Sequence, residues 1–329
     1  MQVMRRLTVL ILLASALAAP AARASASPPD GARFWEPSEA RARFALRHGE
    51  GSSRLRVALA TVLPRGKLEL SALDRAGAPV AVEVTGARGL TRNAGGSWTL
   101  TAPARPGLLH LRVASADAQD EVALVVFVLV PRARVAHGRL NGYEIGSYPP
   151  PSIVQGSLMT PPAGFIEATE ANADTPVSPH FRLGQFLCKQ DGGFPKYLLL
   201  DPLLVAKLEA LLDALRQRGI AADSLEIMSG YRTPWYNRKL GNKTSFSRHL
   251  WGQAADVFVD RAPRDGRMDD LDGNGVSDAR DSAFLFAIAD ELDRAPPEDW
   301  RVGGASSYDS TESHGPFLHV DVRGRAARW

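Results

Sequence analysis

Apolar residues in the N-terminal half of the chain alternate with polar ones, with the period of two that is typical of β-strands. This pattern, or a continuous apolar run, is found in six segments: RLRVALATV (54–62), KLELSAL (67–73), VAVEV (80–84), SWTLT (97–101), LLHLRVA (108–114) and EVALVVFVLV (121–130). Turn sequences with glycine separate most of them. Short strands joined in this way predict an all-β, antiparallel, immunoglobulin-like sandwich domain over residues 36–135. We expect no functional site there, since His48 and His110 stand alone.

The next segment, residues 136–175, has no regular apolar period and is rich in proline and glycine. Both residue types disfavour the interior of helices and central strands. The composition therefore predicts either a linker or an extended segment that packs along the next domain.

The rest of the chain, residues 176–329, combines helical and strand patterns. A helix is predicted after Asp201, a suitable N-cap before Pro202, and it ends before Gly219. Its apolar stripe has the spacing of one helix face: Leu204, Leu208, Leu211 and Leu215. Two further helices are expected, in TPWYNRKL and in SAFLFAIADELDR (282–294). Three strands are expected in SLEIM (224–228), AADVFVD (254–260) and FLHVDV (317–322). These elements predict an α+β domain.

Residues 1–26 have the order of a cleavable secretory signal. Two arginines precede an apolar run from Leu7 to Ala19, and small residues follow it. A helix that spans a bilayer needs about 20 apolar residues, so an uncleaved anchor is only the alternative. We expect an exported protein, periplasmic or cell-wall associated, with no membrane association after cleavage.

Removal of such a signal changes the charge balance. The chain has 39 basic and 36 acidic residues, and without Arg5, Arg6 and Arg23 the two counts are equal at 36. No basic run is interleaved with aromatic residues, so we expect no nucleic-acid partner. The sequence indicates no oligomeric state.

The stretch SRHLWGQAADVFVD (247–260) places His249 seven residues before Asp256, with glycine and alanine between them. These two residues are either a loop histidine and an unrelated carboxylate, or two ligands of one metal ion. Zinc accepts imidazole nitrogen and carboxylate oxygen, and a catalytic zinc site has three protein ligands and an open position. His319 in the strand FLHVDV is the candidate for the third ligand.

Three segments in this order resemble the M15 zinc peptidases, the D-alanyl-D-alanine carboxypeptidase group, including its branch of exported murein endopeptidases: SGYRTPWYN, SRHLWGQAAD and GPFLHVDVRGRAARW. The family pattern Ser-x-His-x-x-Gly-x-Ala-x-Asp is met in full by residues 247–256. The resemblance covers roughly residues 175–329. It implies an α+β zinc-peptidase domain with a small antiparallel sheet, which hydrolyses peptide bonds in peptidoglycan stem peptides or cross-links.

The resemblance also implies roles for single residues. His249, Asp256 and His319 would bind zinc, Arg232 of SGYR would contact the substrate carbonyl or carboxylate, and Ser247 would help to hold the substrate.

The general base that such a reaction needs is left open. Well-known members carry a glutamate three residues before the last histidine ligand or a histidine two residues before it, where this chain has Pro316 and Phe317. The candidates here are His314 and Asp321. Asp321 is alternatively a partner that orients a ligand imidazole, and His314 a plain loop histidine. The departure motivates a rival hypothesis, a non-catalytic zinc-containing protein that binds or scaffolds the cell wall.

The stretch DLDGNGVSDARD (270–281) matches the template of a calcium-binding loop. The oxygen ligands would come from six residues: Asp270, Asp272, Asn274, Val276, Asp278 and Asp281. Calcium at this position would be structural rather than catalytic. The alternative is an acidic surface turn.

Overall fold

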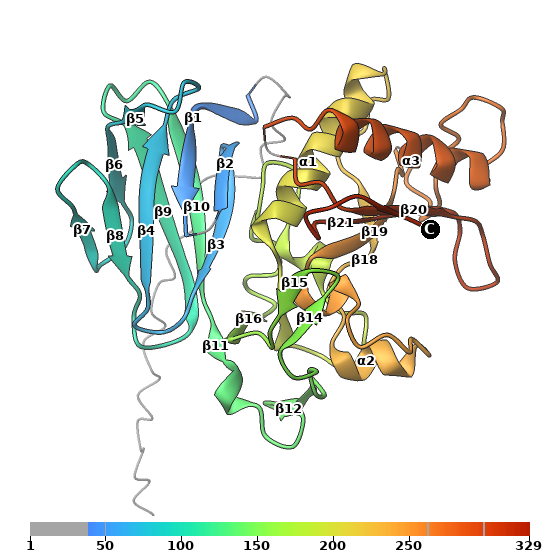
Figure 1. Ribbon diagram of the computed structural model, residues 1–329, viewed down its shortest axis with the longest axis horizontal. Helices are drawn as coiled ribbons and strands as arrows, with labels where there is room; N and C mark the ends of the chain where they lie inside the picture. The colour runs from blue at the N-terminus through green and yellow to red at the C-terminus, as the bar shows by residue number, and fades with distance from the viewer. Residues whose placement is uncertain (1–38, 50, 262, 299) are drawn as a thin grey trace, which may run out of the picture. The chain divides into compact units, whose positions relative to one another are not determined.

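The structure, a computed structural model, describes residues 39–49, 51–261, 263–298 and 300–329 (Figure 1). The predicted secretory signal lies outside the described residues. In the described part of the chain, no helix is both long and apolar enough to cross a membrane.

The N-terminal strands form two sheets whose apolar side chains meet in one core. The first sheet has the order β2-β1-β4-β8-β7, with β5 paired to β4, and the second has the order β3-β10-β9-β6. The shared core contains Phe44 and Leu70 of the first sheet together with Val113 and Leu124 of the second. The bounds are β1 (Arg41–His48), β2 (Gly51–Leu55), β3 (Val57–Val62), β4 (Lys67–Leu73), β5 (Pro79–Val80), β6 (Val82–Thr85), β7 (Leu90–Arg92), β8 (Trp98–Thr101), β9 (Gly107–Ser115) and β10 (Glu121–Val128). An N-terminal β domain agrees with the expectation, and its immunoglobulin-like character stays a prediction.

One strand pair departs from the antiparallel pattern that we expected. Only Arg56 separates β2 from β3, so the chain passes from the first sheet to the second without reversing its direction. As a result β3 runs parallel to β10, with Val57 opposite Ala123 and Val62 opposite Val128. The single strand predicted over residues 54–62 is therefore wrong, because a change of sheet leaves the apolar pattern uninterrupted.

The proline- and glycine-rich segment contains short strands. The elements of this segment and of the residues around it are β11 (Val130–Pro131), η1 (Arg132–Arg134), β12 (Arg139–Leu140), β13 (Tyr143–Glu144), β14 (Ser152–Val154), β15 (Ser157–Met159), β16 (Gly164–Ala168), η2 (Leu183–Phe186) and β17 (Lys196–Leu198), where η marks a 3-10 helix. β16 pairs with β11 and β17, while β12–β13 and β14–β15 are hairpins. The Tyr148 hydroxyl donates to the carbonyl of Leu250 at 2.8 Å, and Trp251 Nε1 donates to the carbonyl of Thr160 at 2.8 Å. These contacts place the segment beside the residues that build the site described below, and the predicted boundaries at 135 and 175 stay predictions.

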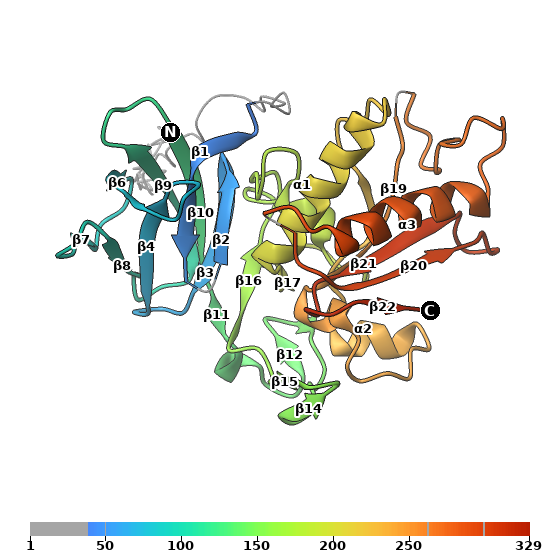
Figure 2. The same ribbon diagram turned by 45° about the horizontal axis from the view of Figure 1, so that its top comes forward.

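The C-terminal part has a five-stranded sheet of order β18-β19-β21-β20-β22, antiparallel except for the pair β20–β22. Helix α3 packs against β20 and β21 and contacts α1 (Figure 2). The bounds are α1 (Pro202–Gln217), β18 (Glu226–Ser229), α2 (Pro234–Lys239), η3 (Arg248–Trp251), β19 (Ala254–Phe258), α3 (Ala279–Arg294), β20 (Gly304–Tyr308), β21 (Phe317–Asp321) and β22 (Ala327–Arg328). This is the α+β arrangement that the sequence predicts.

Helix α1 shows why the local signals were informative. The Asp201 side chain accepts a hydrogen bond from the Leu203 N–H at 2.9 Å, and Pro202 occupies the first turn, where its missing N–H has no partner to lose. All four leucines of the predicted stripe are fully buried: Leu204, Leu208, Leu211 and Leu215. The predicted N-cap, first turn and buried face are confirmed.

Candidate metal centre and pocket

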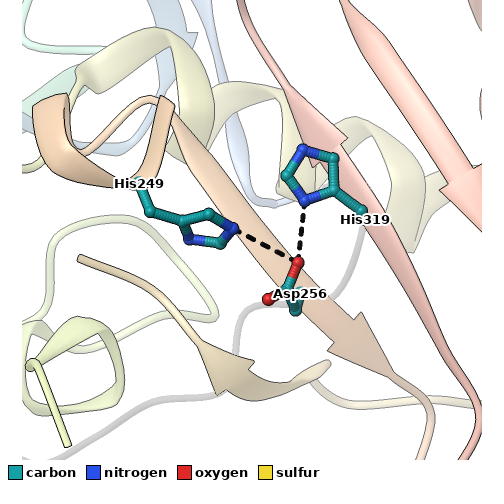
Figure 3. Close-up of side chains that lie close together, drawn as sticks. All are labelled: His249, Asp256 and His319. Carbon is teal, nitrogen blue, oxygen red and sulfur yellow. Dashed lines mark hydrogen bonds and ion pairs between the residues drawn. The ribbon is translucent and has the colours of Figure 1, made fainter. Parts of the chain in front are cut away.

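The register of β19 and β21 places Asp256 directly opposite His319. Side chains that are opposite each other in an antiparallel pair lie on the same face of the sheet. His319 Nδ1 is 2.8 Å from Asp256 Oδ1 (Figure 3). Two residues 63 positions apart in the sequence are thus brought into contact by strand pairing.

His249 reaches the same carboxylate from η3, a short 3-10 helix where the sequence suggested a loop. The helix ends at Gly252, which has a φ of 64°. A Cβ atom at this position would lie 2.2 Å from the Leu199 carbonyl oxygen, so only glycine fits there. The turn brings His249 Nε2 to 3.3 Å from Asp256 Oδ1 (Figure 3).

The backbone fixes the tautomer of His249. Its Nδ1 is 2.7 Å from the carbonyl oxygen of Gly230, which can only accept a hydrogen bond. Nδ1 therefore carries the proton, and Nε2 presents a lone pair toward Asp256. A hydrogen bond of this kind on the outer nitrogen is typical of metal-ligating histidines.

The three side chains fit a zinc ion. Their ligand atoms all lie within 4.8 Å of one another, and all three residues are buried. Two ligands that each lie about 2.0 Å from a tetrahedral zinc are about 3.3 Å apart, which agrees with the His249–Asp256 separation. Two imidazoles and one carboxylate are also a ligand set that zinc accepts in catalytic sites.

Burial and mutual contacts shift the pKa values of the group. Burial lowers the pKa of His249, which favours the neutral, ligating imidazole. For Asp256, burial acts to raise the pKa, but the neighbouring His249 and His319 outweigh it and hold the pKa well below its ordinary value. For His319, burial acts to lower the pKa, but the hydrogen bond to Asp256 and the nearby carboxylate of Asp321 outweigh it and raise the pKa.

Two arginine–carboxylate pairs surround the group. Arg232 pairs through Nη2 with Asp256 Oδ2, and its Nε donates to the Ser229 hydroxyl at 2.8 Å. Asp321 is fully buried and accepts hydrogen bonds from the Gly304 N–H at 2.7 Å and from Nε and Nη2 of Arg323. Asp321 Oδ2 also lies 3.6 Å from His319 Nε2, so it can orient that imidazole from the side away from Asp256.

A pocket of about 510 Å³ is lined by all three residues of the group. Its other lining residues are Val154, Gln155, Arg232, Asn242, Thr244, Phe246, Ser247, Arg248, Tyr308, Phe317, Arg323 and Trp329. Val154 and Gln155 belong to the hairpin β14–β15, within the segment for which a linker was one prediction. This contribution was not expected from the sequence, because a composition rich in proline and glycine indicates no particular position in space.

The structure separates the other predicted site residues into two sets. Arg232 and Ser247 line the pocket, and the Ser247 hydroxyl forms no hydrogen bond with any described residue. His314 and Asp321 are not among the residues that line it. His314 instead places Nδ1 2.9 Å from the Gly315 carbonyl and packs edge-on against Phe317.

The predicted calcium loop brings together Asp270, Asp272 and Asp281, whose ligand atoms lie within 4.8 Å of one another. Most of their oxygens already accept backbone N–H groups. Asp281, fully buried, accepts from Leu271 at 2.7 Å and from Asp278 at 2.8 Å, and it forms a capping box with Asp278 at the start of α3. The other two predicted ligands, Asn274 and Val276, lie in the exposed part of the loop. Calcium binding stays a prediction.

A buried His-Asp-His group that lines a pocket is typical of metal-dependent hydrolases. Residues 180–269 match the family Peptidase M15, a range that contains His249 and Asp256 and ends before His319. The match confirms the resemblance to the M15 peptidases for this part of the C-terminal half.

Two further comparisons add little. No curated protein matches the chain. A structure of the adhesin InvE from Yersinia pseudotuberculosis is similar at 19% identity, over 27% of this chain and 28% of the adhesin chain, with a TM-score of 0.17. A likeness of this size carries no argument about fold or function.

Proposed function

We propose that the protein is an exported zinc metallopeptidase that hydrolyses peptide bonds in peptidoglycan stem peptides or cross-links, as a murein endopeptidase or D,D-carboxypeptidase. The observation that carries the proposal is the buried group His249, Asp256 and His319, which lines a pocket and has two of its three residues in the segment that matches Peptidase M15. The periplasm or cell wall as the place of action is supported by the signal pattern of residues 1–26.

Residues of the chain hold the three metal ligands in the orientation that peptide hydrolysis requires. Zinc, when bound by the three ligands, supplies a Lewis acid for the scissile carbonyl and lowers the pKa of water to about 7. The Gly230 carbonyl, Arg232 and Asp321 each fix the orientation of one ligand. Hydrolysis breaks the C–N bond, adds hydroxide to the acyl carbon and leaves a carboxylate and an amine.

Arg232 and Ser247 are placed to act on the substrate. Arg232 uses Nη2 and Nε for Asp256 and Ser229, which leaves Nη1 without a partner among the described residues. A donor beside the metal is suited to stabilise negative charge on the scissile carbonyl oxygen. The hydroxyl of Ser247, which lines the same pocket and has no partner among the described residues, is suited to hydrogen-bond the peptide backbone.

One observation favours the rival function, a zinc-containing protein that binds the cell wall without cleaving it. Among the described residues that line the pocket, no carboxylate or imidazole is present besides the three zinc ligands. A general base such as His314 or Asp321 would thus have to act from outside the pocket lining.

Turnover separates the two functions. Purified zinc-loaded protein, its His319→Ala variant and, as a control, His110→Ala would be incubated with cross-linked muropeptides, and the products identified by mass spectrometry. The peptidase proposal expects new amine and carboxylate ends with the wild type and with His110→Ala, none with His319→Ala, and inhibition by a chelator. Zinc-dependent binding of the muropeptides without any product would support the scaffold and contradict the peptidase.

A further inference from the structure

Three arginines line the pocket of the metal group, and they differ in their partners. Arg232 forms an ion pair with Asp256, and Arg323 forms one with Asp321. Arg248, which lies between Ser247 and His249, forms no ion pair with any described residue although it lines the same pocket.

Arg248 is also buried, with only 8% of its surface exposed. Its Nη1 donates to the thioether sulfur of Met159 at 2.8 Å and to Gln253 Oε1 at 3.1 Å. The remaining nitrogens, Nε and Nη2, have no partner among the described residues. Neither nitrogen belongs to the buried atoms that lack a partner, so both are accessible from outside the chain. A guanidinium stays charged at neutral pH, and accessible charged donors with no carboxylate in contact are suited to bind an anion from outside the chain.

The Arg248 side chain is held in place before any ligand arrives. Gln253 Nε2 donates to Asp201 Oδ2 at 3.1 Å, so the amide of Gln253 turns its oxygen toward Arg248. Met159, on β15, is buried and closes the other side of Nη1. A fixed guanidinium loses little conformational freedom when it binds its partner.

The open edge of Arg248 has the geometry that carboxylates require. Nε and Nη2 form one side of the planar guanidinium, and Arg323 uses these same two atoms to hold both oxygens of Asp321. A carboxylate bound to this edge is held by two parallel hydrogen bonds. In Arg323 this edge is filled by a carboxylate of the chain itself, whereas in Arg248 no described residue binds it.

The charge of the pocket agrees with an anionic ligand. Among the described residues of the lining, Asp256 is the only acid beside the three arginines, and Asp321, which is not part of the lining, is paired with Arg323. A divalent metal ion would make the pocket more positive still. Pockets lined by one sign of charge concentrate ligands of the opposite sign.

We propose that Arg248 is a specificity-determining residue that binds a carboxylate of the peptide substrate close to the scissile bond. The inference rests on the proposed peptidase function. The carboxylate comes from one of two sources with the same chemistry: the free end of a stem peptide, or the side-chain carboxylate of the diamino acid at a cross-link.

The test compares each carboxylate with its amide. Zinc-loaded full-length protein would be given a stem pentapeptide ending in two D-alanines, free or C-terminally amidated. In a second arm it would be given a cross-linked dimer whose diamino acid carries a free or an amidated carboxylate. The variants are Arg248→Gln and Arg248→Lys, and Arg267→Gln, an exposed arginine outside the pocket, is the matched control.

The expected result is a preference of the wild type for the free carboxylate of about 10- to 100-fold in kcat/KM, in at least one arm. Arg248→Gln brings this ratio close to one, mainly through KM, and Arg248→Lys retains part of it, since lysine keeps the charge without the two-nitrogen edge. Arg267→Gln keeps the wild-type ratio. The arm in which the ratio changes identifies the source of the carboxylate.

Two outcomes would overturn the inference: a wild type without preference in both arms, or a wild-type ratio in Arg248→Gln. If Arg248→Gln fails to fold, as shown by circular dichroism and zinc content, a wild-type ratio in Arg248→Lys has the same meaning. Absence of cleavage by the wild type contradicts the peptidase proposal instead. Calorimetric binding of the same four peptides to the wild type and to the variants then decides the role of Arg248, and equal affinities for acid and amide would reject it.

Discussion

Two groups of acidic and imidazole side chains in the C-terminal half match metal-binding patterns in the sequence, and they differ in what their ligand atoms contact. In the buried group, atoms of His249, Asp256 and His319 face one another, and other residues occupy only their outer atoms. In the loop of residues 270–281, the carboxylates of Asp270 and Asp281 accept backbone N–H groups of the loop itself.

The difference shows what a spacing pattern can establish. A carboxylate that accepts several backbone N–H groups is already satisfied, so it can serve as a helix cap without any ion. In the buried group, the imidazole nitrogens of His319 and His249 lie 2.8 and 3.3 Å from the Asp256 oxygen, and a proton or a metal cation between such atoms stabilises them. We therefore expect the two groups to respond differently to the same substitution.

The largest effect is expected for Asp256→Asn. The amide removes the charged ligand and leaves the Arg232 guanidinium beside a neutral group, so zinc is lost and kcat/KM on muropeptides falls by at least about 10³-fold. Asp281→Asn, the same substitution in the other group, should retain zinc and turnover. Zinc analysis and steady-state kinetics of both variants provide the comparison, and equal losses would contradict it.

His48 is a buried imidazole that has no carboxylate partner among the described residues. Its contribution to the stability of the fold should depend on pH in the opposite sense from that of His319. Burial lowers the pKa of His48 in β1 from 6.5 to about 4. The unfolded chain then binds a proton below about pH 6.5 that the folded protein does not bind until about pH 4. Stability is complete above this window and decreases by up to about 3 kcal/mol as the pH falls through it. Urea unfolding at pH 7 and pH 4.5 checks this, and His48→Gln should lose less stability between them.

Zinc affinity itself should depend on pH. Hydrogen bonds raise the pKa of His319, and zinc must displace the proton that this imidazole holds below its pKa. Each pH unit below that pKa should weaken binding about tenfold if one proton is released. Competition with a chelator of known affinity between pH 8 and pH 5 measures the slope. A flat profile would mean that zinc binding displaces no proton from His319.

The smallest effect is expected in the loop. Asp281 is fully buried and accepts several backbone N–H groups, so Asp281→Asn should lower the free energy of unfolding by about 1–3 kcal/mol. Asp272→Asn, at an exposed position, should change it by less than about 0.5 kcal/mol. Urea denaturation without calcium measures both values. A large loss with Asp272→Asn only when calcium is present would instead favour the predicted calcium site.

Some features of the molecule were accessible from the sequence because they are local. The cap of α1 and its leucine stripe depend on residues within a few turns, and the strands that carry Asp256 and His319 have clear patterns. The first four residues of strand β1 alternate arginine with apolar residues, and this strand could have been recognised in the same way. The change of sheet at Arg56 could not be recognised from the sequence, because both strands keep an apolar pattern whichever sheet they join.

The site shows the same division. The ligand residues follow from the family pattern, whereas the unpaired state of Arg248 depends on where Arg232, Arg323 and their carboxylates lie in space. The contribution of the hairpin β14–β15 to the pocket is likewise a tertiary contact between residues about a hundred positions apart, of the kind seen between Arg248 and Met159. Such contacts leave no periodic trace in the sequence.

The central claim is that His249, Asp256 and His319 hold one zinc ion. Zinc per chain, measured by mass spectrometry after dialysis, would test it on the wild type, His249→Ala and the control His110→Ala, whose histidine is exposed on β9. The account predicts about one zinc per chain in the wild type and the control, and close to none in His249→Ala. A wild type that retains no zinc, or a His249→Ala variant that binds as much as the wild type, would contradict it.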